Sequence, residues 1–225
     1  MVEVDNMSRH DETGVAVDFD KWNSRYGAHE LFYGSAANDY LVDKLSSLVL
    51  AGVLEGDVCP RRALTLGEGE GRNALELLRR GFQVTAIDGS QVAKDKAEAW
   101  AQREGFQIDY RVDDVLQADL VPAEFDVVVN IWLHMPSATR SRMWQRVREW
   151  VRPGGYVLIE HYRPEQLQYR TGGPPDVDLL TTEVELREAF HGFELLELQS
   201  VLRDIQEGSG HRGRSATVQL LARRV

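Results

Sequence analysis

Three glycines at alternate positions, Gly67, Gly69 and Gly71, are the feature that most constrains how this chain folds. They separate the apolar run 63–66 from an amphipathic stretch that begins at Arg72, which is the order of a buried strand turning into a helix. Glycine adopts positive φ at no steric cost and lets a ligand approach the backbone, while the first N–H groups of a helix lack helical partners. The sequence therefore predicts a strand, a tight turn and a helix, with a nucleotide-like ligand over the turn.

An acidic residue stands where such a turn requires one. Residues 83–87 read as a second strand, and Asp88 ends it about twenty residues after the glycines. At that place a carboxylate accepts hydrogen bonds from ribose hydroxyls. The turn and the acidic residue together favour a ligand that contains a nucleoside.

The charges beside the glycines bear on the choice of ligand. A dinucleotide places a pyrophosphate on the helix start, where Glu68 and Glu70 would repel it at low local dielectric. S-adenosylmethionine carries a sulfonium and an ammonium and no phosphate, so it suits this loop better. Two alternatives stay open: an NAD site, because residues 69–74 also fit the pattern G-x-G-x-x-A, and an ordinary turn that binds nothing.

Composition limits the classes of partner. The chain has 225 residues, 43% of them hydrophobic, which suits a single domain over residues 1–225. A net charge of −10 makes nucleic acid and anionic membranes poor partners. One cysteine excludes an internal disulfide, no apolar run reaches bilayer length, and residues 1–20 lack the basic start of a secretion signal. We expect a cytoplasmic protein, by default a monomer, that acts on a small molecule.

Strand and helix patterns alternate along most of the chain. Helical spacing marks 39–51, 92–103, 137–151 and 182–190, and strand patterns mark 63–66, 83–87, 107–112, 125–131, 156–160, 193–205 and 215–225. This alternation predicts an α/β fold: a Rossmann-like, doubly wound, seven-stranded and mostly parallel sheet, closed by an antiparallel C-terminal hairpin. Residues 1–34 carry Trp22, Tyr26, Phe32 and Tyr33, and we expect them to form a helical lid over a core of residues 35–225.

These residues resemble a class I S-adenosylmethionine-dependent methyltransferase. The resemblance lies in residues 66–73, in Asp88, in the string 152–155 before a strand, and in the final hairpin, and it covers roughly residue 41 to the C-terminus. Trp22 with 25–26, and 172–175 after the fifth strand, are similar to the branch of tellurite-resistance and thiopurine, thiol or halide methyltransferases. The family usually has an acidic residue two positions before the first glycine. This chain has Thr65 there, and Glu68 is the candidate to replace it.

The resemblance implies roles for individual residues. The loop lies against the methionine part and the ribose, Asp88 holds the ribose hydroxyls, two residues border the adenine, two contact its edge, and two line the passage from sulfonium to acceptor. In that order the implied cofactor-binding residues are Gly67, Glu68, Gly69, Gly71 and Asn73; Asp88; Gly89 and Ser90; Asp114 and Val115; Asn130 and Ile131.

Histidines and aromatic residues follow the later strands. His134, His161 and His211 map to the carboxyl edge of the sheet, where open α/β folds bind ligands, so each is a candidate general base as well as a candidate structural histidine. On the same rim, Trp132, Tyr162 and Tyr169 are candidates for substrate binding, since aromatic faces attract a sulfonium; core packing is the alternative. No His, Cys or Asp cluster has the spacing of a metal site.

The sequence thus predicts a methyltransferase that acts on a small thiol, selenium or tellurium nucleophile. Methyl transfer is an in-line displacement, in which the protein mainly positions the reactants and excludes water. A thiolate needs little help from a base, whereas an alcohol or amine needs one. The alternatives are a small-molecule O- or N-methyltransferase, an NAD-dependent oxidoreductase, and a non-catalytic regulatory protein that binds the cofactor.

Overall fold

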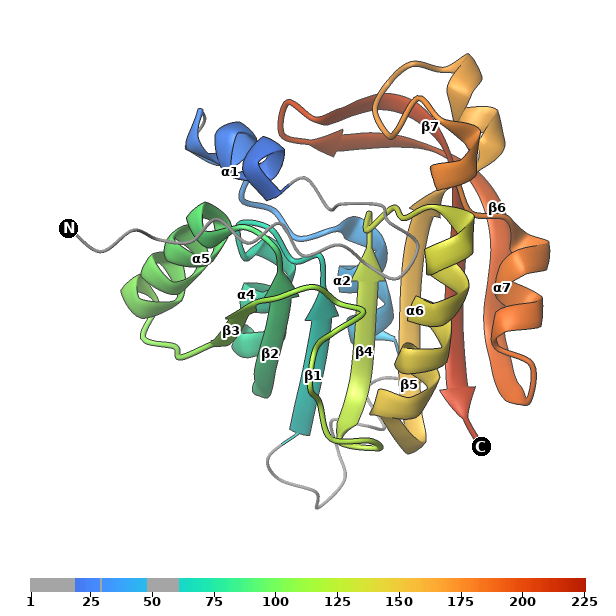
Figure 1. Cartoon of the computed structure of the whole chain (residues 1–225), viewed down its shortest axis with the longest axis horizontal. Helices are drawn as coiled ribbons and strands as arrows, with labels where there is room; N and C mark the ends of the chain where they lie inside the picture. Colours follow the sequence, from blue (N-terminus) through green and yellow to red (C-terminus); the bar gives the residue numbers. More distant parts are fainter. Residues whose placement is uncertain (1–18, 29, 48–60) are drawn as a thin grey trace.

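The computed structural model describes residues 19–28, 30–47 and 61–225. Within these residues one seven-stranded sheet has the order β3-β2-β1-β4-β5-β7-β6 (Figure 1). Its strands are β1 (Arg61–Leu66), β2 (Phe82–Asp88), β3 (Asp109–Val112), β4 (Phe125–Ile131), β5 (Val151–Tyr162), β6 (Phe193–Glu207) and β7 (His211–Arg224). The helices are α1 (Phe19–Gly27), α2 (Asp39–Ser46), α4 (Arg72–Arg79), α5 (Gln91–Arg103), α6 (Ser137–Trp150), α7 (Glu183–Ala189) and the short 3₁₀ helices η1 (Pro164–Gln168) and η2 (Val177–Leu179).

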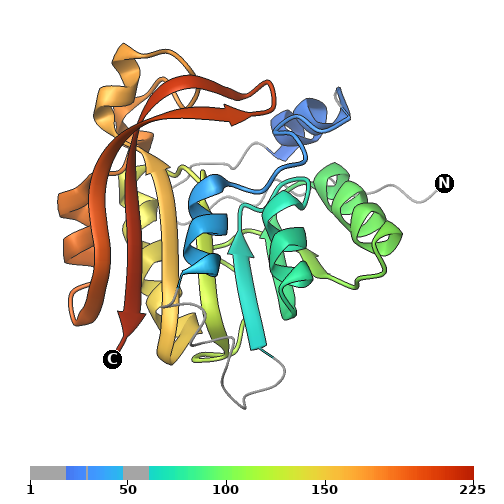
Figure 2. The same cartoon turned by 180° about the vertical axis from the view of Figure 1, so that it is seen from behind.

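The strand directions confirm the predicted fold class. β1 to β5 pair in parallel, because a helix or a longer connection returns the chain between them, and β7 runs antiparallel to both β5 and β6. Every residue of β4 is buried, as expected for a central strand covered on both faces. Side chains of α6 and α7 form the core on the face seen in Figure 1, and those of α2 and α4 form the core on the face seen in Figure 2.

The sheet reverses its winding between β1 and β4. The chain proceeds from β1 to β2 and β3 toward one edge, and from β4 to β5 toward the other. Leu66 at the end of β1 lies opposite Asn130 of β4, so the turn that starts at Gly67 is beside the residues that follow β4. In open α/β sheets this reversal leaves a crevice at the carboxyl ends, which is where ligands bind.

Segments from both ends of the described chain cover this carboxyl edge. The β6–β7 hairpin rises above the sheet and bends over it toward α1 (Figures 1 and 2). At its turn the backbone N–H of Ser209 donates to the carbonyl of Phe32 at 3.0 Å. A Cβ on Gly208 would lie 2.2 Å from that carbonyl oxygen, so the two chain segments touch.

Several element boundaries differ from the sequence prediction. Of the helix predicted over 39–51, α2 covers Asp39–Ser46, and residues 48–51 lie outside the described residues. The string 152–155, expected to separate helix from strand, is a bulge inside β5: Val151 pairs with Phe125 and Tyr156 with Val127. Arg152 holds this bulge through an ion pair with Asp126 at 2.7 Å. The hairpin connection is also shorter than the predicted 207–213, because β6 runs to Glu207 and β7 starts at His211.

A buried guanidinium fixes the segment before α7. The Arg140 side chain, 3% exposed, donates to both carboxylate oxygens of Glu185 at 2.6 and 2.9 Å. Its Nη1 donates to the carbonyls of Met135 and Asp178, each at 2.8 Å. Arg140 therefore ties α6 to the loop at Asp178 and to the first turn of α7.

We expect Arg140→Ala to destabilise the fold by about 3–5 kcal/mol, because it leaves a partly buried carboxylate and two carbonyls without their donor. Denaturant unfolding should show a lower midpoint with an unchanged slope. Arg187→Ala is the control: Arg187 pairs with Glu183 at 3.2 Å but is 59% exposed, and its loss should change stability by less than about 0.5 kcal/mol. Similar effects of the two changes would contradict a structural role for Arg140.

Candidate active site

The glycine turn has the backbone that its sequence predicts. Gly67, Gly69 and Gly71 have φ values of 61°, 64° and 98°, all in the region that favours glycine. The close approaches come from the chain itself: a Cβ on Gly67 would lie 2.9 Å from Leu133, and one on Gly69 would lie 2.8 Å from the hydroxyl of Tyr26. The turn is therefore enclosed by the residues after β4 on one side and by α1 on the other.

Both glutamates of the turn have partners within the protein. Glu68 accepts hydrogen bonds from the backbone N–H groups of Asn73 and Ala74 at 3.1 and 2.9 Å, and so caps α4, whose N-cap is a glycine. Burial raises the pKa of Glu68 to about 7. Glu70 pairs with Lys96 at 2.8 Å and accepts from the N–H of Phe32 at 2.7 Å. Glu68 thus points into a helix start, and the ammonium contact that the resemblance suggested for it stays a prediction.

Asp88 lies between the glycine turn and the start of α5. One carboxylate oxygen accepts from the N–H of Gly69 and the other from the N–H of Ser90, both at 2.9 Å. Burial raises the pKa of Asp88 to about 6, although these hydrogen bonds oppose the shift. The side chain therefore already orders the turn, and its position at the end of β2 is the one expected for a ribose contact.

The residues implied for the adenine lie around the same edge. Ser90 caps α5 by accepting from the N–H of Ala93 at 3.1 Å. Asp114 follows β3, and its carboxylate accepts from the N–H of Leu116 at 2.9 Å. Val115 is buried in the core that α6 forms with the sheet. A Cβ on Gly89 would lie 1.9 Å from the ring of Phe19, so α1 rests directly on this part of the edge.

Helix α1 is held over the turn by polar contacts. The side chain of Asn23 accepts from the Ser90 hydroxyl at 2.7 Å, and Lys96 donates to the carbonyls of Tyr26 and Glu30 at 2.5 and 2.9 Å. The described part of the predicted lid, residues 19–28 and 30–34, thus lies where the lid was expected, while residues 1–18 and 29 are outside the described residues. The division into a lid and a core stays a prediction.

Hydrogen bonds fix the tautomer of His161. The amide N–H₂ of Asn130 is directed at the sulfur of Met143 at 3.3 Å, so its carbonyl oxygen faces the ring of His161 at 2.8 Å and accepts from Nε2–H. Nδ1 of His161 then accepts from the Thr181 hydroxyl at 2.9 Å. Burial lowers the pKa of His161 well below its ordinary value. Asn130 and His161 are therefore hydrogen-bonded to each other below the carboxyl edge of the sheet. Both ring nitrogens of His161 have partners within the protein, so neither is left for a substrate.

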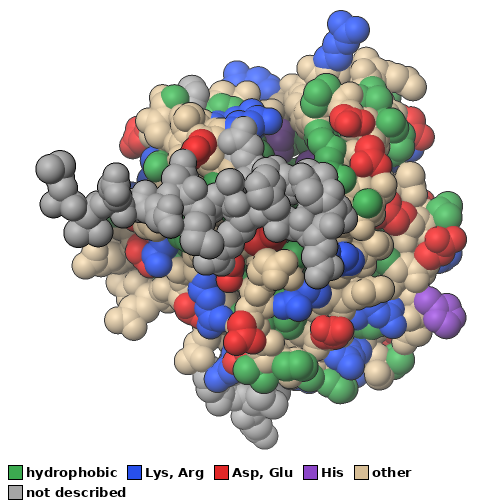
Figure 3. All heavy atoms as spheres, in the orientation of Figure 1, with side chains coloured by type: hydrophobic (Ala, Val, Ile, Leu, Met, Phe, Trp, Pro, Cys, Tyr) green, Lys and Arg blue, Asp and Glu red, His purple; other side chains and the backbone are tan. Residues whose placement is uncertain are grey.

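His134 has the opposite tautomer. Its Nδ1 lies 3.0 Å from the carbonyl of Leu179, which only accepts, so Nδ1 carries the proton. Nε2 is then a lone-pair acceptor, and it is buried without a hydrogen-bond partner among the described residues. Burial, followed by the neighbouring His211, lowers the pKa of His134 to about 3. Figure 3 shows histidine side chains inside a hollow above the carboxyl edge.

Aromatic rings from four segments pack around this hollow. Trp132 stacks on Tyr162 at 4.4 Å between ring centroids, and His211 packs edge-on to both at 5.1 and 5.2 Å. Tyr33 adds a fourth ring, 4.9 Å from His211. Burial lowers the pKa of His211, although the nearby Glu207 carboxylate opposes the shift. The structure thus brings together Trp132, Tyr162 and His211 as predicted, and adds Tyr33.

Two predicted residues lie apart from this cluster. Tyr169 follows η1, is half-buried, and is not among the rings that pack there. Ile131 is buried in the core on the α4 face of the sheet. Among the described residues, no group of three or more His, Cys, Asp or Glu side chains has metal-binding geometry, and no helix is long and apolar enough to cross a membrane.

Sequence reasoning missed the residues that pack against the glycine turn and the buried residues that form hydrogen bonds beneath it. Leu133 packs on Gly67, and Arg72 and Asn38 both donate to the buried carboxylate of Glu207. Arg72 belongs to the glycine motif, but its partner is 135 residues away in the sequence. Glu207 was missed because the sequence pattern placed it in the hairpin connection 207–213, whereas it is the last residue of β6.

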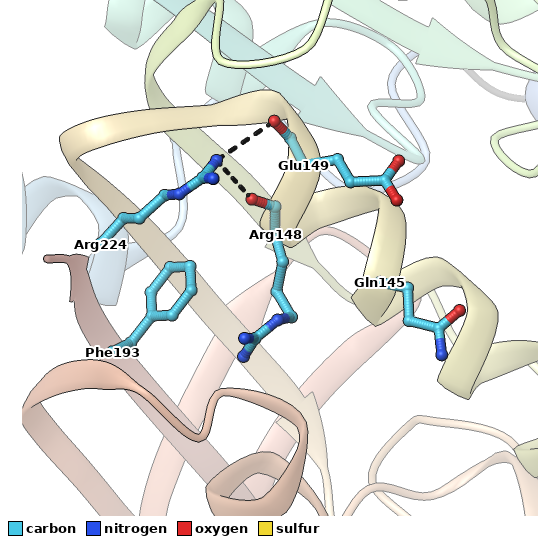
Figure 4. A pocket seen from close by; sticks show the side chains of 5 residues that line it. All are labelled: Gln145, Arg148, Glu149, Phe193 and Arg224. Atoms are coloured by element: carbon cyan, nitrogen blue, oxygen red, sulfur yellow. Dashed lines mark hydrogen bonds between the residues drawn. The ribbon is translucent and has the colours of Figure 1, made fainter.

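A second hollow lies at the opposite edge of the sheet. Figure 4 shows that it is lined by Gln145, Arg148, Glu149, Phe193 and Arg224. Nη1 of Arg224 donates to the carbonyls of Arg148, Glu149 and Val151 at the end of α6. Nη1 of Arg148 donates to the carbonyl of Ala189, the last residue of α7, and to that of His191. One nitrogen of each arginine thus donates to carbonyls at a helix end, where the helix itself supplies no donor.

Comparisons with known proteins agree with this geometry. Residues 63–155 match a family model described as a methyltransferase domain. The chain is 26% identical over 138 residues to the ubiquinone biosynthesis O-methyltransferase of Rickettsia prowazekii (strain Madrid E), and this alignment covers 60% of the chain. The chain spans about half of that relative, with 50% of its length covered.

Solved structures share the fold over nearly the whole chain. One, from work on the conversion of a disulfide bond into a thioacetal group during echinomycin biosynthesis, has a TM-score of 0.70 at 21% identity, with 92% of this chain and 91% of that chain covered. TehB from Haemophilus influenzae has a TM-score of 0.67 at 20% identity, with 93% and 68% covered. Magnesium protoporphyrin IX methyltransferase from Synechocystis PCC 6803, with bound S-adenosylhomocysteine, has a TM-score of 0.64 at 17% identity, with 92% and 97% covered.

We expect S-adenosylhomocysteine to bind more weakly in acid because of Asp88. Its pKa of about 6 means that above pH 7 it is ionised, the form that would accept from a bound ribose, and that below pH 6 it becomes protonated. Affinity should then fall by about tenfold between pH 7 and pH 5, which calorimetric titration measures. Asp88→Ala should weaken binding at pH 7 by about 1.5–3 kcal/mol, the range for a hydrogen bond to a charged group.

Asp88→Asn is the matched control for the pH dependence, since it keeps the shape and removes the titration. Any slope that survives in this variant belongs to another group, with Glu68 first because of its pKa of about 7. An unchanged slope and an unchanged affinity in Asp88→Asn would remove Asp88 from the ligand site.

We expect α1 and residues 30–34 to gain protection from hydrogen exchange when S-adenosylhomocysteine binds. Helix α1 lies on Gly69 and Gly89, and the N–H of Phe32 donates to Glu70 of the same turn, so a ligand there would add contacts to both segments. Helix α7 is the internal control, since it packs on the far part of the sheet against β6 and β7 and should not change. Equal exchange of α1 with and without ligand would make it a passive cover.

Proposed function

We propose that this chain, which carries a class I S-adenosylmethionine-dependent methyltransferase domain, transfers a methyl group to a small molecule through a thiol sulfur or a similarly soft selenium or tellurium atom. S-adenosylmethionine is the cofactor of such a domain. The observation that carries the proposed acceptor is His134: its Nε2 lone pair is buried without a hydrogen-bond partner among the described residues, and its pKa is lowered to about 3.

The base strength of His134 separates the acceptor classes. A group with a pKa of about 3 holds a proton poorly at neutral pH, so it is a weak general base. A thiol has an ordinary pKa near 8.5, so a useful fraction ionises without help, while an aliphatic alcohol does not ionise in this range. In this proposal Nε2 of His134 accepts a hydrogen bond from the acceptor and orients it, and the acceptor supplies its own reactivity.

The remaining parts of the proposal follow the position of each group. We assign the cofactor to the turn at Gly67–Gly71, with Asp88 on the ribose and the segments around Gly89 and Asp114 near the adenine. The faces of Trp132 and Tyr162 are proposed to border the sulfonium and the acceptor, since aromatic rings attract a cation and exclude water. His161 is assigned a structural role, because both of its nitrogens are bonded inside the protein.

Structural neighbours support sulfur as the acceptor atom. The work behind one of them concerns the conversion of a disulfide bond into a thioacetal group, which is chemistry at sulfur. At 21% identity the likeness is one of fold, so its support for the proposal is that this fold occurs in a protein studied for sulfur chemistry. The similarity of residues 22–26 and 172–175 to the thiol and halide branch points the same way. Cytoplasmic location and a monomeric state stay predictions.

The second candidate is O-methylation. It is favoured by the curated relative, an O-methyltransferase of ubiquinone biosynthesis that shares 26% identity over 138 residues. Among oxygen acceptors a phenol fits best: its hydroxyl has a pKa near 10 and ionises more easily than that of an alcohol, so a weaker base is enough to deprotonate it.

Two measurements test the proposal. S-adenosylhomocysteine should raise the unfolding temperature and NAD should not, since a ligand at a hundred times its Kd adds about 2.7 kcal/mol of stability. A panel of thiols, selenite, tellurite, halides, phenols and amines, with methyl transfer from S-adenosylmethionine as the readout, then identifies the acceptor class. Turnover confined to phenols or amines would overturn the soft acceptor, and stabilisation by NAD alone would overturn the methyltransferase.

With the acceptor from this panel, we expect His134→Ala to lower kcat by about tenfold through lost orientation, and no histidine variant to lose more than about a hundredfold. His161→Ala should mainly lower stability, because it leaves Asn130 and Thr181 without their partner. His191→Ala is the control, since His191 is exposed after α7. A thousandfold loss in His134→Ala with unchanged affinity for S-adenosylhomocysteine would assign it as a general base and exclude a soft nucleophile.

A further inference from the structure

One buried carboxylate connects the two sides of the candidate active site. Glu207, the last residue of β6, is 6% exposed. Its Oε2 accepts from Arg72 at 2.6 Å and from the indole Nε1–H of Trp132 at 2.7 Å, and its Oε1 accepts from the side-chain amide of Asn38 at 2.8 Å. Arg72 is the first residue of α4 and directly follows the glycine turn. Trp132 directly follows β4 and is one of the rings around the hollow at the carboxyl edge.

The charge of this carboxylate is matched by its surroundings. Nδ1 of His211 lies 3.5 Å from Oε2, and Arg203 lies 3.8 Å from Oε1. Arg203 also pairs with Glu160 at 2.8 Å, and Glu160 accepts from Asn38 at 2.7 Å. Burial opposes ionisation of Glu207, but the neighbouring His211 ring and the charge of Arg72 hold its pKa well below the usual range. A buried carboxylate with this many donors is a fixed anchor.

Trp132 needs such an anchor because its backbone is strained. Its φ is 62°, in the left-handed region that residues other than glycine rarely adopt. Such conformations persist only where the surroundings determine them, and they concentrate at functional sites. The backbone N–H donates to the carbonyl of Glu160 at 3.1 Å, the ring stacks on Tyr162 at 4.4 Å, and the indole N–H donates to Glu207.

We infer that Glu207 is a positioning residue for methyl transfer: it holds the indole of Trp132 in place and ties it, through the same carboxylate oxygen, to Arg72 behind the cofactor turn. The end of the hairpin, the indole of Trp132 and the start of α4 behind the glycine turn then hold fixed positions relative to one another. This inference rests on the proposed function, in which Trp132 borders the acceptor. Glu207 touches neither reactant and acts through Trp132 and Arg72.

The first test is spectroscopic and needs no substrate. The chain has five tryptophans, so ¹⁵N-labelled protein gives five indole N–H resonances, and Trp132→Phe identifies the one from Trp132. We expect Glu207→Gln to move this resonance upfield and to speed its exchange with water, because the neutral amide has one acceptor oxygen for three donors. Glu194→Gln, at the exposed far end of the same strand, is the control and should leave it unchanged.

The second test is a cycle of Glu207→Gln and Trp132→Phe on the affinity for S-adenosylhomocysteine and on kcat. Each single variant should lower kcat by about tenfold and weaken binding by about threefold, and the double variant should be no worse than the poorer single variant. Multiplying effects in the double variant, or an unmoved Trp132 resonance in Glu207→Gln, would overturn the inference. If Glu207→Gln fails to fold, Glu207→Asp, which keeps the charge but shortens the reach to the indole, takes its place with the same expected shift.

Failure of the proposed function would look different. Wild-type protein that neither binds S-adenosylhomocysteine nor methylates any member of the acceptor panel would remove the proposed function, and with it the role of Glu207 in methyl transfer. In that case the Trp132 resonance would still respond to Glu207→Gln, and the carboxylate would be a structural anchor alone.

Discussion

The tight turn from β1 into α4 sets the geometry on which the site depends. Gly67, Gly69 and Gly71 all take positive φ, and a side chain on any of them would meet Leu133, Tyr26 or Ala97 within 3 Å. Because β1 and β4 lie next to each other where the sheet reverses its winding, this turn faces the segment that starts at Trp132. The distance between the proposed donor and acceptor groups is thus fixed by strand pairing and not by a flexible loop.

The sequence was sufficient for the parts of the fold that local physics determines. Strand β4 and helices α5 and α6 were predicted within one residue, because a mostly apolar, β-branched run and an amphipathic face are local patterns. The bulge at 152–155 was missed because Pro and Gly read as a helix stop, while the ion pair of Arg152 with Asp126, which shapes it, joins residues far apart in sequence. Glu185 shows the same limit: Thr182 caps α7 by accepting from the N–H of Glu185, which is a local pattern, but the Glu185 side chain pairs with Arg140 and Trp144, which the fold brings from far along the chain.

The candidate site divides in the same way. The glycines, Asp88 and the aromatic residues at the ends of β4 and β5 could be named as candidates because their place at strand ends is visible in the sequence. The state of each histidine was not, because it depends on partners such as Leu179 and Asn130 that the fold supplies. Three histidines of similar sequence context thus became a lone-pair acceptor, a structural pair with an amide, and a ring beside a carboxylate.

Buried carboxylates explain why a cationic cofactor suits this edge better than a dinucleotide. Glu68 and Asp88 have pKa values raised to about 7 and 6, because burial removes water from their charged forms. The positive charges of a sulfonium and an ammonium at this edge would stabilise the ionised carboxylates. This attraction would offset the desolvation penalty that the carboxylates carry when no ligand is bound. A pyrophosphate would add negative charge and push both pKa values higher, which costs binding energy.

The direct repulsion first attributed to Glu68 and Glu70 is smaller than the sequence suggested, because one caps a helix and the other pairs with Lys96. The preference for a cation therefore depends on desolvation of this edge more than on any single charge beside the glycines.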